Sequence, residues 1–208
     1  MEYGGHARKG AGQRVRAGLP FSVVSERSDA PGDMHIRTLD TLEDVRELDD
    51  LLREYIQFVT DDLRRAHGVS FDADVLLANT RNSLHKVVPP HGVTLVAEAD
   101  DGTRLGMGFL RPSGSDAMEI KRLYVPPRGR GQGAGKALVT HAIGIAQARG
   151  KIALRLDSTR NLETAIALYR KLGFEECAPY PESDHYDDPV LAPHMIFMEK
   201  RLESSAGP

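Results

Sequence analysis

The chain contains little of several residue types, and each scarcity excludes a class of protein. Among 208 residues there is one cysteine and no tryptophan, and aromatic residues make up 6%. The single cysteine, Cys177, excludes an internal disulfide and a cysteine metal cluster, so a reduced, cytoplasmic setting is expected. No apolar run approaches the ~18 residues of a membrane span. The first residues are basic but have no apolar segment typical of a signal peptide, and no membrane partner is expected.

The chain also lacks an excess of positive charge. Lysine and arginine total 27 against 30 acidic residues, which gives a formal net charge of −3 and a pI near 6.2. This balance argues against a nucleic-acid partner. The eight histidines show no zinc-like spacing, so no metal is predicted. With 40% hydrophobic residues, the length is enough for one globular domain with a sizeable core.

The first 33 residues differ from the rest of the chain. They are rich in glycine and basic residues and show no helical or strand-like apolar pattern, which predicts a disordered extension at 1–33. One hypothesis is that Met34 is the natural start, and another is that the basic extension touches a partner. The patterned region then forms one domain at 34–203, and 204–208 are a C-terminal tail.

Hydrophobic periodicity predicts an α/β (α+β) domain. A capping-box variant at Thr41–Asp44 begins a helix whose apolar spacing continues to Val59. The order is an antiparallel meander, then a βαβ unit, then a last strand, which gives a mixed central sheet with flanking helices. The predicted strands are 34–39, 93–100, 104–111, 117–125, 152–157 and 195–202, and the later helices are 72–84, 135–149 and 161–172.

The most informative segment is glycine-rich. Three alternate glycines, Gly131, Gly133 and Gly135, follow a strand and two prolines and precede a helix. Unpaired N–H groups at a helix N-terminus bind phosphate, and glycine allows the backbone to come close to it. A nucleotide P-loop is rejected, because Ala137 supplies no hydroxyl after the lysine.

A dinucleotide fingerprint is an alternative for the same segment. Residues Gly129–Ala134 fit a loose GxGxxA pattern, and Asp157 ends the next strand at about the expected ~20 residues on. Against it, two prolines separate strand and glycines where that motif has a tight turn. Too little chain follows to complete a doubly wound sheet. This NAD-type hypothesis is the weaker one.

A third interpretation fits best. The segment Leu123-Tyr-Val-Pro-Pro-Arg-Gly-Arg130-Gly-Gln-Gly-Ala-Gly135 resembles the coenzyme A loop of the GCN5-related N-acetyltransferase (GNAT) family. Downstream, Ala165-Ile-Ala-Leu-Tyr169-Arg-Lys-Leu-Gly-Phe174 resembles the second marker of that family, in the right order and spacing. The resemblance covers roughly 34–202 and implies the GNAT fold with acetyl-CoA as co-substrate. The cofactor-contacting positions that it implies are Leu123, Tyr124, Val125, Arg130, Gly131, Gln132, Gly133, Ala134, Gly135, Lys136 and Asn161.

The resemblance also implies catalytic residues. Tyr169 matches the tyrosine that protonates the leaving thiolate, and otherwise it is a core aromatic. Glu119, eleven residues before Arg130, matches a general-base glutamate. Its alternative is a solvent-facing carboxylate paired with Lys121, which would lower its pKa. Asn161 stands one position before the usual cofactor-contacting asparagine, and helix capping is its competing role.

The resemblance implies an enzyme that transfers an acetyl group directly to a primary amine of a small molecule. A protein lysine or N-terminus as acceptor, and a non-catalytic acyl-CoA sensor, are alternatives. The first helix and the loop at 180–188 are dense in acid and could attract a cationic amine, although solvated faces explain such charge equally well. His185 and Tyr186 lie in that loop and could touch substrate. A homodimer is possible by family analogy.

Overall fold

The computed structural model describes residues 34–203, so the predicted extension at 1–33 and the tail at 204–208 lie outside the described residues. The strands are β1 (Met34–Leu39), β2 (Val93–Ala99), β3 (Arg104–Ser113), β4 (Ala117–Tyr124), β5 (Ala153–Thr159), β6 (Glu175–Glu176) and β7 (Met195–Arg201). The α-helices are α1 (Leu42–Arg46), α2 (Asp49–His67), α3 (Ala73–Asn82), α4 (Ala134–Ala148) and α5 (Glu163–Lys171). Short 3₁₀ turns are η1 (Leu84–Val87), η2 (Pro127–Gly129) and η3 (Ala192–His194).

The strands form one mixed sheet in the order β1-β2-β3-β4-β5-β7-β6. All neighbours are antiparallel except β4 and β5, which are parallel and joined through α4. This is the predicted meander followed by a βαβ unit, and the predicted fold class is confirmed. A mainly antiparallel sheet is not the doubly wound parallel sheet that the dinucleotide hypothesis requires.

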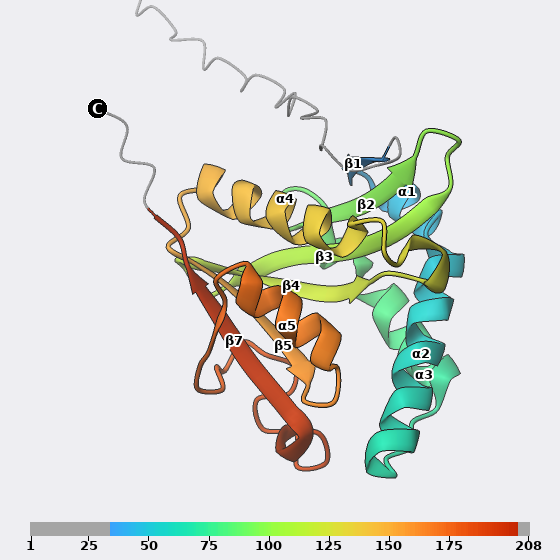
Figure 1. The fold of residues 1–208 in the computed structure, drawn as a ribbon, viewed down its shortest axis with the longest axis vertical. Helices are drawn as coiled ribbons and strands as arrows, with labels where there is room; N and C mark the ends of the chain where they lie inside the picture. Colours follow the sequence, from blue (N-terminus) through green and yellow to red (C-terminus); the bar gives the residue numbers. More distant parts are fainter. Residues whose placement is uncertain (1–33, 204–208) are drawn as a thin grey trace, which may run out of the picture.

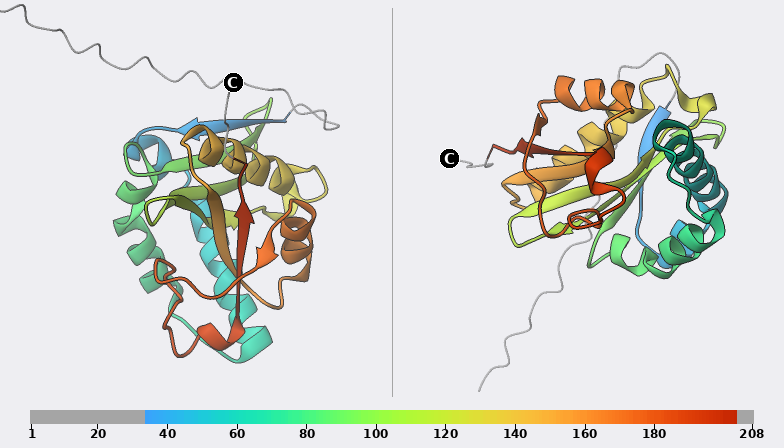
Figure 2. Two further views of the ribbon diagram at one scale, coloured as in Figure 1. Left: turned by 90° about the vertical axis from the view of Figure 1, so that its left-hand side faces the viewer. Right: turned by 90° about the horizontal axis from the view of Figure 1, so that it is seen from below.

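Helices cover both faces of the sheet. Helices α4 and α5 lie on one face and α1, α2 and α3 on the other (Figures 1 and 2). Along each strand, alternate side chains therefore enter two different cores. In β4, Met118 and Ile120 pack beneath α4 and α5, whereas Glu119 and Lys121 point to the opposite face. This alternation determines which β4 side chains can meet an acceptor.

The first predicted helix is divided in two. Thr41 caps α1 as predicted, because its hydroxyl accepts from the N–H of Asp44 at 3.1 Å. The chain then tightens, with the N–H groups of Glu47 and Leu48 each bonding a carbonyl three residues back. Helix α2 begins at Asp49 and continues beyond the predicted end, to a left-handed Gly68. The apolar spacing of the sequence does not reveal this break, because Leu48 is buried on the same side as the apolar residues of both helices.

The segment between β6 and β7 has little regular structure, yet it returns to the sheet. It packs through Tyr180 and Leu191 against α2 and β7 in a third, smaller core. This placement lays the loop at 180–188 over the polar side chains of β4 and β5. No helix within 34–203 is both long and apolar enough to span a membrane.

Candidate acyl-coenzyme A and acceptor site

The glycine-rich loop joins β4 to the N-terminus of α4. Gly131 and Gly133 have φ angles of +76° and +83°, and Gly133 is the N-cap of α4. The first helical bond runs from the N–H of Ala137 to the carbonyl of Gly133. The N–H groups of the three residues before Ala137 consequently have no partner within the helix. The loop thus presents unpaired donors where the helix dipole favours negative charge.

The glycines of the loop serve two purposes. At Gly129 a Cβ would lie 2.0 Å from the carbonyl oxygen of Leu105, so packing alone requires glycine there. At Gly131 and Gly133 a Cβ would meet no atom within 4 Å, but the left-handed backbone disfavours any side chain. These two glycines leave open space above the donors, as a bound phosphate would need.

Positive charge borders the loop. Lys136 is exposed in the first turn of α4. Arg130 donates from Nε to the carbonyl of Val125 at 3.3 Å, and its guanidinium lies 5.9 Å from the ring centre of Phe58. Gln132 turns back and donates to the carbonyl of Arg128. Arg130 and Lys136 therefore reinforce the loop electrostatically, whereas the Gln132 side chain stabilises it internally.

Strands β4 and β5 separate close to the loop. They pair only from Ala117 to Ile120 on β4, and further along the strands run apart (Figure 1). At Arg122 the backbone is left-handed, with φ 54°, and the β3–β4 register shifts at the same place. A bulge of this kind breaks the ladder and redirects backbone groups. The gap exposes the β4 main chain at Leu123, where the family resemblance places the pantetheine arm.

The side chains at the end of β4 have different surroundings. Leu123 and Val125 are partly buried against the α4 and α5 side. Tyr124 is buried on the other side, with its ring centre 5.9 Å from that of Tyr55 and 5.7 Å from that of Phe58. Tyr124 therefore packs α2 onto the sheet, and any cofactor contact from this stretch would come from its backbone.

Tyr169 lies on α5 and is buried. Its ring packs against Phe174 at 5.9 Å between centres. Burial raises the pKa of its hydroxyl well above the ordinary value, and Tyr55 and Asp157 raise it further. Within 34–203 that hydroxyl makes no hydrogen bond. Tyr169 is thus a protonated phenol that is free to donate at neutral pH, although it also fills the core.

Asn161 does not cap α5. The N-cap is Leu162, which makes no side-chain capping bond. Asn161 instead donates from Nδ2 to Asp62 at 2.7 Å, and its Oδ1 meets Nε2 of His67 at 2.9 Å. The expected capping role is therefore wrong. The side chain ties α5 to the end of α2, and its predicted contact with the cofactor stays a prediction.

Glu119 is fully buried on the face opposite α4. Arg111 donates from Nε at 2.9 Å to one carboxylate oxygen, and the hydroxyl of Tyr180 donates to the other at 2.8 Å. Lys121 is 3.5 Å away. The solvent-facing alternative is wrong, because the side chain is 0% exposed. Burial raises the pKa of Glu119 and outweighs Lys121 and Arg111, which lower it.

Lys121 connects this carboxylate to two others. Its Nζ lies 2.9 Å from Asp157 and 3.4 Å from Asp184. Ser183 also donates to Asp157, at 2.6 Å. Burial disfavours a charge on Asp184, but the cations Lys121 and Arg111 prevail and hold its pKa at about 2. Strand and loop carboxylates are therefore joined by two cations, the buried Lys121 and the partly buried Arg111.

Half of the acidic residues noticed in the first helices and the late loop are thus paired with arginine. In the late loop, Asp184 pairs with Arg111 and Glu182 lies 3.8 Å from Arg155. On the first helices, acids meet arginines in the same way, with the pairs Glu47–Arg104, Asp49–Arg81 and Glu54–Arg128. The contacts of Arg111 and Tyr180 with Glu119 could not be predicted from the sequence, since they arise only from cross-strand pairing and loop packing.

His185 sits in the same polar layer. Its Nδ1 is buried with no hydrogen-bond partner in the described structure. Burial lowers the pKa of the imidazole more than the nearby Asp157 raises it. The side chain is therefore neutral near pH 7, and it lies near Asp157 and Lys121, the residues that follow the last β4–β5 pair. Tyr186, the other loop residue singled out in the sequence, is largely exposed.

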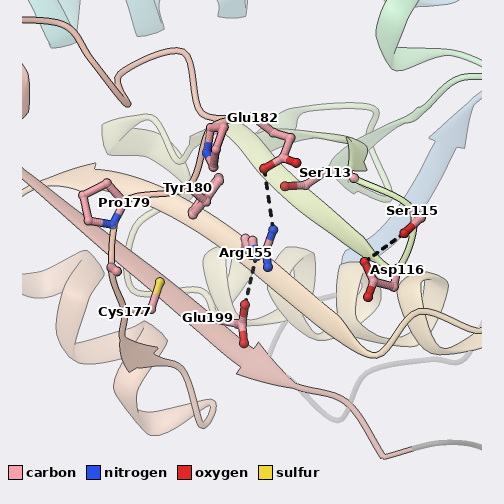
Figure 3. A pocket seen from close by; sticks show the side chains of 12 residues that line it. Ser113, Ser115, Asp116, Arg155, Cys177, Pro179, Tyr180, Glu182 and Glu199 are labelled. Carbon is pink, nitrogen blue, oxygen red and sulfur yellow. Dashed lines mark hydrogen bonds and ion pairs between the residues drawn. The ribbon is translucent and has the colours of Figure 1, made fainter.

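Two cavities adjoin this layer. The larger, of about 650 Å³, is lined by Ser113, Arg155, Cys177 and Tyr180 among others and lies at the far end of β4 from the glycine loop (Figure 3). The smaller, of about 110 Å³, lies between η1 and the bulge of β4 and includes Lys121 and Arg122. Only the smaller one is lined by residues of the β4 bulge.

The fold is that of an acyl-CoA-dependent N-acyltransferase, with β4 and β5 separated beside the glycine-rich loop before α4. Comparisons with known proteins agree with this class. A sequence model of the acetyltransferase (GNAT) family matches residues 52–174. An uncharacterized N-acetyltransferase of Schizosaccharomyces pombe is 32% identical over 180 residues, which are 84% of this chain and 98% of that protein. An IAA acetyltransferase of Azospirillum brasilense is 31% identical over 73% of this chain and 93% of its own length. The chain therefore belongs to the GNAT family.

Solved structures show the same fold. The PaiA N-acetyltransferase of Thermoplasma acidophilum, in complex with coenzyme A, superposes with a TM-score of 0.54 at 23% identity, covering 81% of this chain and 99% of that chain. YncA of Salmonella typhimurium, solved with its cofactor acetyl-CoA, gives a TM-score of 0.55 at 22% identity, covering 85% of this chain and 98% of that chain. These structures confirm the predicted fold, and the sequence matches confirm the predicted family.

Proposed function

We propose that this protein transfers an acetyl group from acetyl-CoA to a primary amine of a small molecule, by direct attack in a ternary complex. The observation that carries the proposal is the loop itself. Unpaired N–H groups at the start of α4 lie beside the gap where β4 leaves β5. One ligand can meet both features only if it has a pyrophosphate and a long arm that pairs with a strand.

The residues of the site fit such a ligand. The N–H groups of residues 131–136 receive the pyrophosphate, with Arg130 and Lys136 adding charge. The arm pairs with the main chain of Leu123, Tyr124 and Val125. A backbone N–H at the bulge then polarises the thioester carbonyl.

The reaction requires that the acceptor amine lose a proton and that the leaving sulfur gain one. The amine nitrogen attacks the thioester carbon, so that a C–N bond forms and the C–S bond breaks. Tyr169 supplies the proton for the leaving sulfur, since its raised pKa keeps the phenol protonated. The amine must first lose a proton, because an ammonium has no lone pair.

Two groups are candidates for accepting that proton. Glu119 is the one expected from the sequence, and burial raises its pKa toward that of a useful base. Both of its oxygens already accept hydrogen bonds, from Arg111 and Tyr180. His185 offers an unpartnered nitrogen in the same layer. We therefore include His185 as an alternative base, in which case Glu119 acts by positioning Tyr180, whose hydroxyl donates to it.

Calorimetric titration with acetyl-CoA, and separately with NAD, tests the proposal first. We expect saturable binding of acetyl-CoA alone, followed by release of free thiol when amines are added. The amine panel includes short peptides with a free lysine or N-terminus. Binding of NAD without acetyl-CoA would refute the proposed co-substrate. Turnover with peptides only would refute the small-molecule acceptor.

A further inference from the structure

The cavity beside the β4 bulge has an unusual charge. Four cationic side chains line it, Lys86, Arg111, Lys121 and Arg122, against a single carboxylate, Asp184. Its volume of about 110 Å³ holds a group of a few heavy atoms, since a water in the liquid occupies ~30 Å³. It opens beside the place where an acceptor would approach the thioester. A cationic amine would meet repulsion here.

Two of the four cations are already neutralised and two are not. Arg111 and Lys121 are bound to Glu119, Asp157 and Asp184. In contrast, the side chains of Arg122 and Lys86 form no ion pair or hydrogen bond with any residue of 34–203. Asp184 is near enough to Arg122 for the guanidinium to lower its pKa, but not within ion-pair distance.

The backbone of Arg122 supports a functional reason for this arginine. Among the described residues it is the only non-glycine with a left-handed backbone, at φ 54°. Such a position favours glycine, so an arginine there is strained. The guanidinium lies 5.9 Å from the ring centre of Tyr55, which orients it without neutralising it. A half-buried, oriented and unpaired guanidinium suits an anionic partner.

We propose that this cavity binds an anionic group, a carboxylate or phosphate, carried by the acceptor together with its reacting amine. Arg122 is the main contact and Lys86 adds charge from η1. This inference rests on the proposed function and names its substrate class. Because Arg122 directly precedes Leu123, the anion would sit next to the amine that attacks the thioester. Acceptors with the two groups close together, such as α-amino acids or short amino-phosphates, satisfy this spacing.

Matched pairs of acceptors test the inference. L-amino acids are compared with their amides, and ethanolamine phosphate with ethanolamine, so that each pair differs in the anion. The wild type should prefer the anionic member by about tenfold to a hundredfold in kcat/KM, the loss expected when one charge-assisted contact is removed. Carboxylate and phosphate pairs identify which anion is used. Equal or better turnover of the uncharged members would overturn the inference and leave the acetyltransferase proposal standing.

Variants locate the contact. Arg122→Gln and Arg122→Gly should both abolish the preference while acetyl-CoA affinity stays unchanged. Arg122→Gly also relieves the left-handed strain, so it should melt no lower than Arg122→Gln. The control Arg149→Gln removes an exposed charge at the end of α4 and should keep the preference. A preference that survives both Arg122 variants would overturn the inference.

Binding of simple anions provides a readout that does not need turnover. Glycine, in which the amine and carboxylate are adjacent, and inorganic phosphate are titrated into the coenzyme A-bound wild type and the coenzyme A-bound Arg122→Gln variant, which hold no acetyl group to transfer, and binding is followed by NMR. We expect at least one of these probes to bind the wild type and to weaken about tenfold or more in the variant. No binding that depends on Arg122 would refute the inference. Failure of acetyl-CoA itself to bind would instead refute the proposed function.

Discussion

Replacing Gly133 with valine should remove the pyrophosphate contact and leave the fold intact. The φ of +83° allows glycine, and a β-branched residue there costs about 1–2 kcal/mol of stability. A Cβ at Gly133 would meet no protein atom within 4 Å, so nothing in the protein itself clashes. The side chain would instead occupy the space in which a phosphate approaches the N–H groups of α4.

The size of the effect follows from the donors lost. If two N–H groups lose a charged phosphate, each contact is worth about 1.5–3 kcal/mol, so the total is ~3–6 kcal/mol. The Kd for acetyl-CoA should then rise about 10²- to 10⁴-fold. Calorimetry with acetyl-CoA and with acetylpantetheine, which lacks the pyrophosphate, should show that only the first ligand loses affinity.

The same helix supplies a matched control. Gly150 follows the other end of α4, with a φ of +68° and no atom within 4 Å of a Cβ. Gly150→Val should therefore cost similar stability and leave acetyl-CoA binding unchanged. Retained affinity in Gly133→Val, or equal loss in Gly150→Val, would refute the assignment of the loop.

Three further predictions concern the chemistry and the buried network. Tyr169→Phe should lower kcat about 10²-fold or more with little change in acetyl-CoA affinity, and unchanged turnover would remove the hydroxyl from the mechanism. For the base, kcat/KM profiles of Glu119→Gln and His185→Gln are compared. The variant that lacks the true base should lose most at low pH, where the amine is protonated, and a uniform loss across pH would indicate a positioning role. The third change is Asp184→Asn, with exposed Asp40→Asn as control. The folded pKa of Asp184, about 2, lies below its ordinary 3.8, so its stabilisation is full at neutral pH and disappears as pH falls from about 4 to 2. Urea unfolding should show a deficit for Asp184→Asn at pH 7 that shrinks below pH 4, and a deficit independent of pH would contradict this account.

Local signals in the sequence determined most of the fold. The capping of α1 by Thr41 follows from a short-range preference, and so does the left-handed Gly133 at the start of α4. The two-residue and helical periodicities identified the main strands and helices, because burial on one face requires them. The two family markers also predicted the acyl-CoA site, because a phosphate-binding turn is built from residues that are adjacent in the sequence.

Only the tertiary structure decided the surroundings of the site. Glu119 lies beside Arg111 because β3 and β4 pair in one register, and Asn161 meets Asp62 because α5 packs at the end of α2. The left-handed bulge at Arg122 likewise depends on how many β4 residues face β3. Such contacts join residues that are far apart in the chain, so they cannot be predicted from the preferences of neighbouring residues. The sequence alone therefore determined which co-substrate to expect, whereas only the folded structure brings Arg122 and Lys86 to the cavity that we propose for the anionic group of the acceptor.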